Sequence, residues 1–190
     1  GNEVEFVPLI NFKTGTSGLN PGWGFNYPTA KIAAAFDAEG DVIRKNASVL
    51  SVADLRSKFG GDWTEDWTKP DPVWGMEGYF RLKYGSLTAE TSSADGAVAE
   101  LNYGTNVRLI RYSDVLLMAA EANLLAGNAS IAQGYFTEVR DRVNLPVKTV
   151  SLDAIKTERR LELAFEGVRF LDLIRWGDAA TVLKQQGFSK

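Results

Sequence analysis

Apolar residues recur every three or four positions through the second half of the chain, which is the spacing of helices that bury one face. A first helix is predicted from Ser113, as its N-cap, to about Ala126, with Gly127 as its stop. Its inward-facing residues are Leu116, Leu117, Ala120 and Leu124. A second helix is predicted from Asn128 to about Val143. Its apolar face comprises Ile131, Tyr135, Phe136 and Val139.

Small and apolar residues in these two helices fit the spacing of a tetratricopeptide helical hairpin. They are Leu116, Ala119, Ala120, Ala132 and Phe136. The alanines would let the two helices approach closely, and the phenylalanine ring would fill the space between them. A third helix is predicted from Ser151 to about Phe165. Gly167 interrupts it, and residues 168–176 continue at a new angle until Gly177.

The first half of the chain carries only two short helical patterns. One has Thr29 as its N-terminal cap and ends at Gly40, with Ile32, Ala35 and Phe36 at helical spacing. The other runs from Ser51 to Phe59, where Ser51 and Asp54 form a capping box.

The remainder of the first half is predicted to be irregular. Val4–Val7 and Tyr79–Tyr84 alternate like short strands, whereas residues 62–75 and 85–105 have the composition of loops. The predicted fold is therefore mainly α, with a tetratricopeptide-like hairpin, a bent C-terminal helix, long irregular loops and short β-strands. We divide the chain into a loop-rich part, 1–107, and a helical part, 108–190.

Composition excludes several classes of chemistry. The 190 residues include no cysteine and no histidine, so thiol nucleophiles, Ser-His-Asp triads and Cys or His metal sites are impossible. The net charge is -3 without a basic run, which argues against a nucleic-acid partner. The longest apolar run, 115–120, is too short to span a bilayer. No cofactor is expected.

The densest group of charges lies between residues 158 and 175. Its members are Glu158, Arg159, Arg160, Glu162, Glu166, Arg169, Asp172 and Arg175. Glu158, Glu162 and Glu166 share a helix face and could form a carboxylate pair of the kind that glycoside hydrolases use. The interleaved arginines would, however, hold these carboxylates ionised. We therefore expect a structural network that ties three helices together, with Trp176 in the core.

Aromatic residues in the loops are the candidate binding residues. Flat rings stack on the C–H faces of sugars, while Asn and Asp side chains bond the hydroxyls. The candidates are Trp23, Phe25, Asn26, Trp63, Trp67 and Trp74. Alternatively, some of these rings only cover small clusters beneath the loops, and core packing is favoured for Trp74. The acidic residues Asp62, Glu65, Asp66 and Asp71 could bind calcium, but they lack the usual spacing, and a solvated loop is favoured.

Three blocks in this order resemble the C-terminal part of the SusD/RagB family. They are R-L-I-R-Y-S-D-V-L-L-M-A-A-E-A-N-L-L-A-G-N from Arg108, F-T-E-V-R-D-R-V-N-L-P from Phe136, and E-R-R-L-E-L-A-F-E-G-V-R-F-L-D-L-I-R-W-G from Glu158. Shorter runs around Pro28–Thr29 and Gly78–Tyr84 also match. The resemblance implies a non-enzymatic outer-membrane lipoprotein at the cell surface. Such a protein binds nutrient oligosaccharide and delivers it to a TonB-dependent transporter of the SusC type.

Two other functions stay open from the residues alone: a carboxylate-based glycoside hydrolase, and a helical-repeat scaffold that binds a peptide or protein on the hairpin. Members of the family are longer, with a lipid-anchored N-terminal part and further tetratricopeptide-like helices. The resemblance therefore implies a C-terminal piece whose membrane association depends on the missing part. We expect its helices to expose an apolar surface that those further helices would cover.

Overall fold

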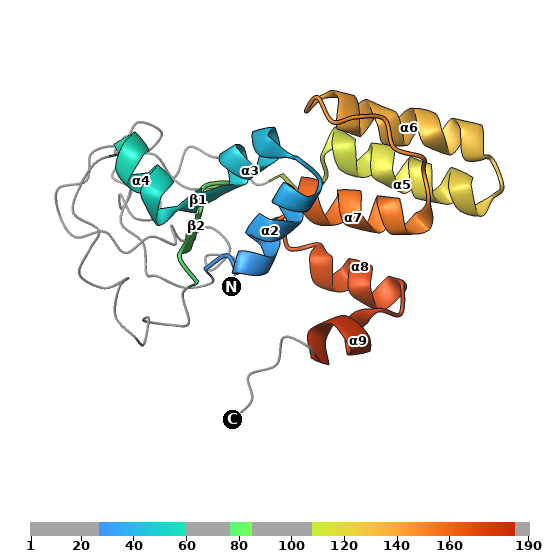
Figure 1. Cartoon of the computed structure of the whole chain (residues 1–190). Helices are drawn as coiled ribbons and strands as arrows, with labels where there is room; N and C mark the ends of the chain where they lie inside the picture. Colours follow the sequence, from blue (N-terminus) through green and yellow to red (C-terminus); the bar gives the residue numbers. More distant parts are fainter. Residues whose placement is uncertain (1–26, 60–76, 85–107, 185–190) are drawn as a thin grey trace, which may run out of the picture. The chain divides into compact units, whose positions relative to one another are not determined.

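The computed structural model describes residues 27–59, 77–84 and 108–184, and it divides the chain into two compact units, Gly1–Leu109 and Ile110–Lys190 (Figure 1). In the first unit the described elements are α2 (Ala30–Ala38), α3 (Val42–Ser48), β1 (Val49–Ser51), α4 (Val52–Phe59) and β2 (Tyr79–Arg81). In the second they are α5 (Tyr112–Leu125), α6 (Ala129–Asp141), α7 (Leu152–Glu162), α8 (Arg169–Arg175) and α9 (Ala179–Lys184). The prediction of a mainly helical fold with a short sheet is confirmed.

Helix α2 forms where its pattern predicts. Its buried residues are Ala33 and Phe36, and Gly40, at a φ of 68°, follows its C-terminal end. Thr29 occupies the N-cap position, but the predicted capping bond is wrong, because its side chain makes none. The Glu77 carboxylate instead accepts a hydrogen bond of 2.6 Å from the backbone N–H of Ala30. The first turn of α2 is thus completed by a residue 47 positions away in the sequence.

The segment between α2 and α4 contains two elements that the sequence did not predict. Asp41 caps α3 by accepting from the backbone N–H of Arg44 at 3.1 Å, and its carboxylate also pairs with the Arg44 guanidinium. Strand β1 pairs antiparallel with β2, so that Leu50 lies opposite Phe80. The predicted strand at Tyr79 is therefore confirmed, but it ends earlier, at Arg81.

The capping box at the start of α4 is confirmed. The backbone N–H of Ser51 donates to Asp54 Oδ2 at 3.1 Å, and the backbone N–H of Asp54 donates to Ser51 Oγ at 3.1 Å. The Ser51 hydroxyl also donates to the Asp54 carboxylate, which lowers the pKa of that carboxyl group. Among the described residues of this unit, the large apolar side chains that are fully buried are Phe36, Leu50, Leu55 and Phe80.

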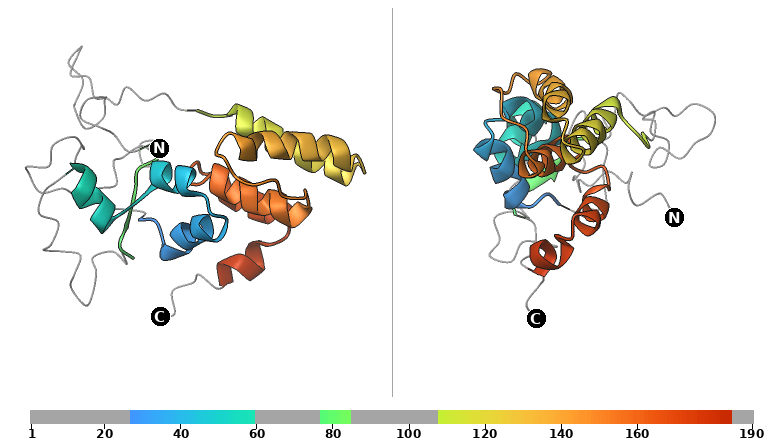
Figure 2. Two further views of the ribbon diagram at one scale, coloured as in Figure 1. Left: turned by 45° about the horizontal axis from the view of Figure 1, so that its top comes forward. Right: turned by 90° about the vertical axis from the view of Figure 1, so that its right-hand side faces the viewer.

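In the second unit, α5 and α6 form the predicted helical hairpin, and α7 packs against it (Figures 1 and 2). The core between the three helices contains Leu116, Leu117, Ala120, Ala132, Phe136, Val139, Val150, Ala154 and Ile155. The hairpin turn is made by Gly127, whose φ of 82° suits glycine. Four of the five residues at tetratricopeptide spacing are buried here, and Ala119 lies partly buried beside them.

Three details of the hairpin differ from the prediction. Arg111, not Ser113, occupies the N-cap of α5, and Ser113 lies inside the helix. Hydrogen bonds from the Arg111 side chain to Glu162 and Glu166 fix the start of the helix two residues earlier than predicted. Ile131 and Tyr135 were expected on the buried face of α6, but they are 52% and 36% exposed. The buried face is centred on Ala132, Phe136, Val139 and Arg140, because burying Arg140 against Glu158 turns the helix away from Ile131.

The bend after α7 is confirmed. Ser151 caps α7 by accepting from the backbone N–H of Ala154 at 3.1 Å. The helix ends at Glu162, earlier than predicted, and Phe165 and Gly167 then adopt φ values of 67° and 78°. These left-handed residues reverse the chain into α8. The last described helix, α9, follows Gly177 and was not predicted.

Candidate functional site

The predicted binding residues lie outside the described part of the chain. Trp23, Phe25 and Asn26 precede residue 27, and Trp63, Trp67 and Trp74 lie between residues 60 and 76. The acidic residues considered for calcium fall in the same second segment. Their positions therefore have to be argued from the described residues that flank the two segments.

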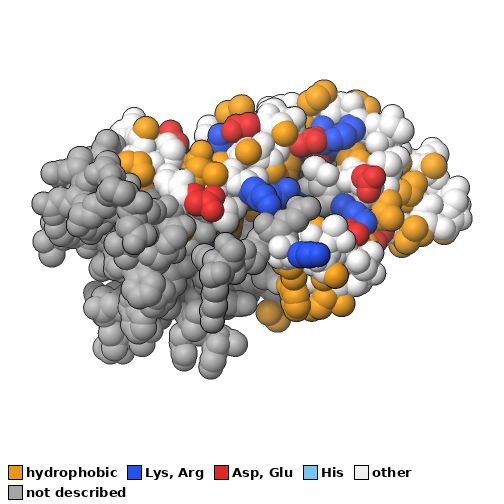
Figure 3. Space-filling model, turned by 60° about the horizontal axis from the view of Figure 1, so that its bottom comes forward, with side chains coloured by type: hydrophobic (Ala, Val, Ile, Leu, Met, Phe, Trp, Pro, Cys, Tyr) orange, Lys and Arg blue, Asp and Glu red, His pale blue; other side chains and the backbone are white. Residues whose placement is uncertain are grey.

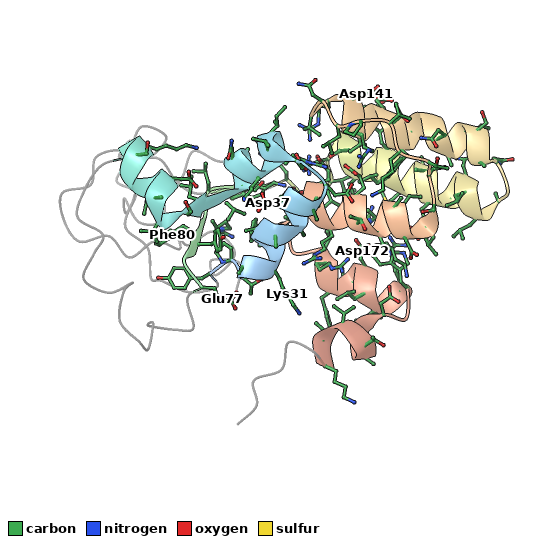
Figure 4. The ribbon with its side chains drawn as sticks, viewed as in Figure 1. Lys31, Asp37, Glu77, Phe80, Asp141 and Asp172 are labelled. Carbon is green, nitrogen blue, oxygen red and sulfur yellow. The ribbon has the colours of Figure 1, made fainter. Side chains whose placement is uncertain are left out.

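The residues that follow these two aromatic segments lie next to one another. The Tyr27 and Phe80 rings meet edge to face, with their centroids 5.9 Å apart. Glu77 accepts from the backbone N–H of Ala30 at 2.6 Å (Figure 4). Tyr27 and Glu77 directly follow the two aromatic segments and are about 50 positions apart in the sequence. These contacts therefore bring together the described residues that follow the two segments.

A second aromatic contact lies at the far end of β2. The Arg108 guanidinium carbon lies 5.9 Å from the centroid of the Tyr84 ring. Tyr84 itself adopts a left-handed backbone, with a φ of 58°. The described residues on either side of 85–107 thus lie close to each other at this pair. Sequence patterns did not single it out, because the two residues are far apart along the chain.

The charged group at the C-terminal end is an ion-pair network, as predicted. Glu158 pairs with Arg140 at 2.7 Å, and Glu162 lies between Arg111 at 3.0 Å and Arg142 at 2.7 Å. Glu166 makes two bonds to Arg111, of 2.7 and 2.8 Å. Each of the three glutamates therefore faces a guanidinium, and the arrangement lacks the two differing carboxyl environments that acid–base chemistry needs.

A second group of ion pairs joins α5, α7 and α8. Arg159 bonds Asp114 at 2.7 Å and Asp172 at 2.9 Å. Arg175 bonds Asp172 at 2.8 Å and Glu121 at 2.7 Å. Asp172 is thus shared by two arginines, and α8 is attached to α5 and α7 through charges (Figure 4).

The electrostatics of this group stabilise the ionised forms. Burial alone would raise the pKa of Glu121, but hydrogen bonds from Arg175 and Trp176 outweigh it and lower that pKa. For Arg111, burial would lower the pKa, and the bonds to Glu166 and Glu162 raise it instead. Because its pKa is lowered, the Glu121 carboxyl group is a poor proton donor near neutral pH.

Trp176 does not lie in the core, which corrects the prediction. It is partly buried, and its indole N–H donates to Glu121 at 2.8 Å. Its ring lies 4.3 Å from the Arg175 guanidinium and 5.3 Å from the Lys156 ammonium. The ring is therefore placed by charges, because the indole can stack on cations while its N–H bonds a carboxylate.

Several network residues were not identified from the sequence. They are Arg111, Asp114, Glu121, Arg140 and Arg142. Asp114 and Glu121 stand two helical turns apart on α5 and so share a face, which is a signal that could have found them. On the face shown in Figure 3, acidic and basic side chains of the described residues lie interspersed with apolar ones.

Among residues 27–59, 77–84 and 108–184, none of the helices is both long and apolar enough to cross a membrane. In the same ranges, acidic side chains do not gather in groups of three or more that could bind a metal ion.

Comparison with known proteins identifies similar sequences and structures. A sequence profile of the SusD family matches residues 56–188. A SusD-like protein of Bacteroides ovatus is 34% identical over 145 residues, which are 72% of this chain and 24% of that protein.

Among solved structures, a laminarin-binding SusD-like protein superposes with a TM-score of 0.75 at 32% identity, over 100% of this chain and 39% of the other. Surface glycan-binding protein A of Bacteroides thetaiotaomicron, solved in complex with laminarihexaose, superposes with a TM-score of 0.71 at 30% identity. That match covers 94% of this chain and 38% of the other. The chain thus spans well under half the length of these relatives.

Proposed function

Because the chain belongs to the SusD family, we propose that it is part of a cell-surface protein that binds a nutrient oligosaccharide and delivers it to a TonB-dependent outer-membrane transporter of the SusC type. The family comprises glycan-binding proteins and not enzymes, which confirms the expectation of a non-enzymatic chain. Its solved relatives include one named for laminarin binding and one that holds laminarihexaose. These names support an oligosaccharide as the ligand here.

The observation that carries the proposal for the site is the contact of Tyr27 with Phe80, together with the bond from Ala30 to Glu77. It brings the flanks of the two aromatic segments together. We assign the ligand to the rings of these segments, which are Trp23, Phe25, Trp63, Trp67 and Trp74, with Asn26 bonding the hydroxyls. Trp23 is proposed as the central ring, because glycines flank it on both sides and no helical or strand period predicts its burial.

Calorimetry on the 190-residue chain tests this assignment, with laminarihexaose, maltohexaose, xylohexaose and mannohexaose as probes. Trp23→Ala should weaken binding of the preferred glycan by about 1–3 kcal/mol, the range for an aromatic anchor, while the melting temperature stays unchanged. Tyr112→Ala is the matched control, since it removes a ring that is 69% exposed on α5. The site assignment fails if W23A unfolds the chain or binds normally. The glycan proposal fails if none of the four probes binds.

The proposed cell-surface location and the proposed delivery of glycan to a transporter have to be tested on the longer parent protein. The name of surface glycan-binding protein A supports a place on the cell surface, and we propose attachment to the outer membrane through a lipid anchor outside these residues. Affinity purification of the tagged parent from detergent-solubilised outer membranes should recover a TonB-dependent transporter in stoichiometric amount. Recovery of the parent alone, under conditions that keep other transporter complexes intact, would contradict the delivery step.

A further inference from the structure

Arg169 on α8 differs from the arginines of the ion-pair groups. Arg159 and Arg175 each bond two carboxylates. The Nη1 atom of Arg169 is buried, in contrast, and has no hydrogen-bond partner within the described part of the chain. A buried N–H of a charged group that bonds nothing costs free energy, so its presence in a fold calls for an explanation, and a bound ion is one.

The carboxylates whose charges reach Arg169 are already bonded to other cations. Asp172 is shared by two arginines of the second ion-pair group, and Asp178 bonds Lys156 at 2.6 Å. Burial and the charge of Arg160 lower the pKa of Arg169, and the charges of the two aspartates do not offset them. The surroundings of this guanidinium are therefore short of negative charge.

Arg160 on α7 brings a second positive charge to the same place. Its side chain is partly buried, and burial lowers its pKa as well. The chain reverses between the two arginines, at Phe165 and Gly167, so that one guanidinium comes from each of two successive helices. Like charges close together repel each other, and an oxyanion between them would replace this repulsion by attraction to both.

The surface beside Arg169 is open to solution. Gly167 and Phe170, its near neighbours in the chain, are both exposed, the phenylalanine by 55%. An arginine side chain has several rotatable bonds, so a small rotation would direct Nη1 toward a ligand that arrives there. A guanidinium donates two parallel N–H bonds to carboxylate or to tetrahedral oxyanions. The chemistry of the pair therefore selects a group with at least two acceptor oxygens.

We propose that Arg160 and Arg169 form a binding site for an oxyanion, a sulfate or carboxylate group, which joins α7 to α8. Two sources supply this chemistry, namely free inorganic sulfate and the acid group of a charged sugar. The bound group would attach α8 to α7 in addition to the ion pairs of Asp172. The inference does not depend on the glycan-binding proposal, because it uses only side chains of the described helices.

Thermal unfolding of the 190-residue chain, followed by far-UV circular dichroism in Tris chloride at neutral pH, tests the site. Sodium sulfate and sodium glucuronate are the probes, and sodium chloride at the same ionic strength is the control for screening. An oxyanion with a dissociation constant of about 1 mM should raise the melting temperature by about 4 °C at about 10 mM. A larger rise with sulfate supports an inorganic anion as the occupant, and a larger rise with glucuronate supports the acid group of a sugar.

Arg169→Gln removes the proposed contact. Arg142→Gln is the matched control, because it makes the same exchange at a side chain that is 56% exposed and bonds Glu162. R169Q should lose the response to both probes, while R142Q keeps it. Without either probe, R169Q should melt no lower than the native chain, because Nη1 has no bond to lose.

Four results would overturn the proposal. They are no response of the native chain to either probe, an equal rise with sodium chloride, a response that persists in R169Q, and a melting temperature of R169Q that lies several degrees below that of the native chain without the probes. The third result would mean that sulfate acts generally, by being excluded from the protein surface. The last would mean that Arg169 is bonded within the fold and has only a structural role.

Discussion

Replacing Glu166 by glutamine tests how much of the stability of the helical unit comes from its ion pairs. Arg111 uses all five of its N–H donors, on Glu166, Glu162, Ser113 and the backbone carbonyl of Glu162, at distances of 2.7 to 3.0 Å. Only 22% of the Arg111 side chain and 9% of the Glu166 side chain are exposed. Water therefore cannot replace the lost carboxylate.

The magnitude follows from what the variant leaves behind. The glutamine amide keeps one acceptor oxygen, but its NH2 group faces a guanidinium N–H, so one charge-assisted bond becomes a clash of donors. Losing a hydrogen bond to a charged group costs about 1.5–3 kcal/mol. Leaving a buried charge without its partner costs about 3–5 kcal/mol, and Glu162 still balances part of the Arg111 charge. We expect E166Q to lower the free energy of unfolding by about 3 kcal/mol.

Urea unfolding of the 190-residue chain at neutral pH, followed by far-UV circular dichroism, measures this difference. Asp37→Asn is the matched control, because it also turns a carboxylate into an amide and removes one ion pair, to Lys45, but its side chain is 62% exposed. D37N should cost less than about 1 kcal/mol, as surface pairs do. Equal costs for the two variants, or a cost below about 1 kcal/mol for E166Q, would refute the reasoning.

Two further predictions concern acid stability and capping. The lowered pKa of Glu121 stabilises the fold above the ordinary glutamate pKa of about 4.3, and this contribution disappears as the pH falls through the lowered value. Between about pH 5 and 3, the melting temperature of Glu121→Gln should therefore change less than that of the native chain. If the melting temperature of E121Q falls as steeply with acid as that of the native chain, Glu121 does not contribute to the acid-dependent stability. Ser151→Ala should cost about 1 kcal/mol in urea unfolding, and Thr29→Ala, whose side chain makes no capping bond, a few tenths at most; similar costs would contradict the capping geometry.

Sequence patterns correctly predicted those structural features that depend on residues close to one another in the chain. The Ser51–Asp54 box, the Ser151 cap and the stop at Gly127 each involve residues within a few positions of one another, and all three are present. The buried face of α5 was also predicted, because leucine and alanine recur there without interruption.

Contacts between distant residues explain what the sequence could not predict. Glu77 completes the first turn of α2, and the Arg140–Glu158 pair turns α6 so that Ile131 and Tyr135 face outward. Neither interaction is visible as a period or a spacing. Trp176 was assigned to the core because of its apolar neighbours, whereas its partners are Arg175 and Glu121. The binding residues proposed in the two aromatic segments stay predictions, since they lie outside the described part of the chain.

Helix α8 shows that the helical unit is held together in two different ways. Only Asp172 and Leu173 of this helix are buried, while Phe170, Leu171 and Ile174 are more than half exposed. A helix of seven residues is too short to persist alone in water, so its attachment depends on the ion pairs that it makes with other helices, Asp172 with Arg159 and Arg175 with Glu121. Acid protonates these carboxylates but leaves apolar burial largely intact, and it should therefore release α8 before the hairpin loosens. The acidity of the medium, more than its salt content, should thus decide whether α8 stays attached, because buried ion pairs are screened little by salt.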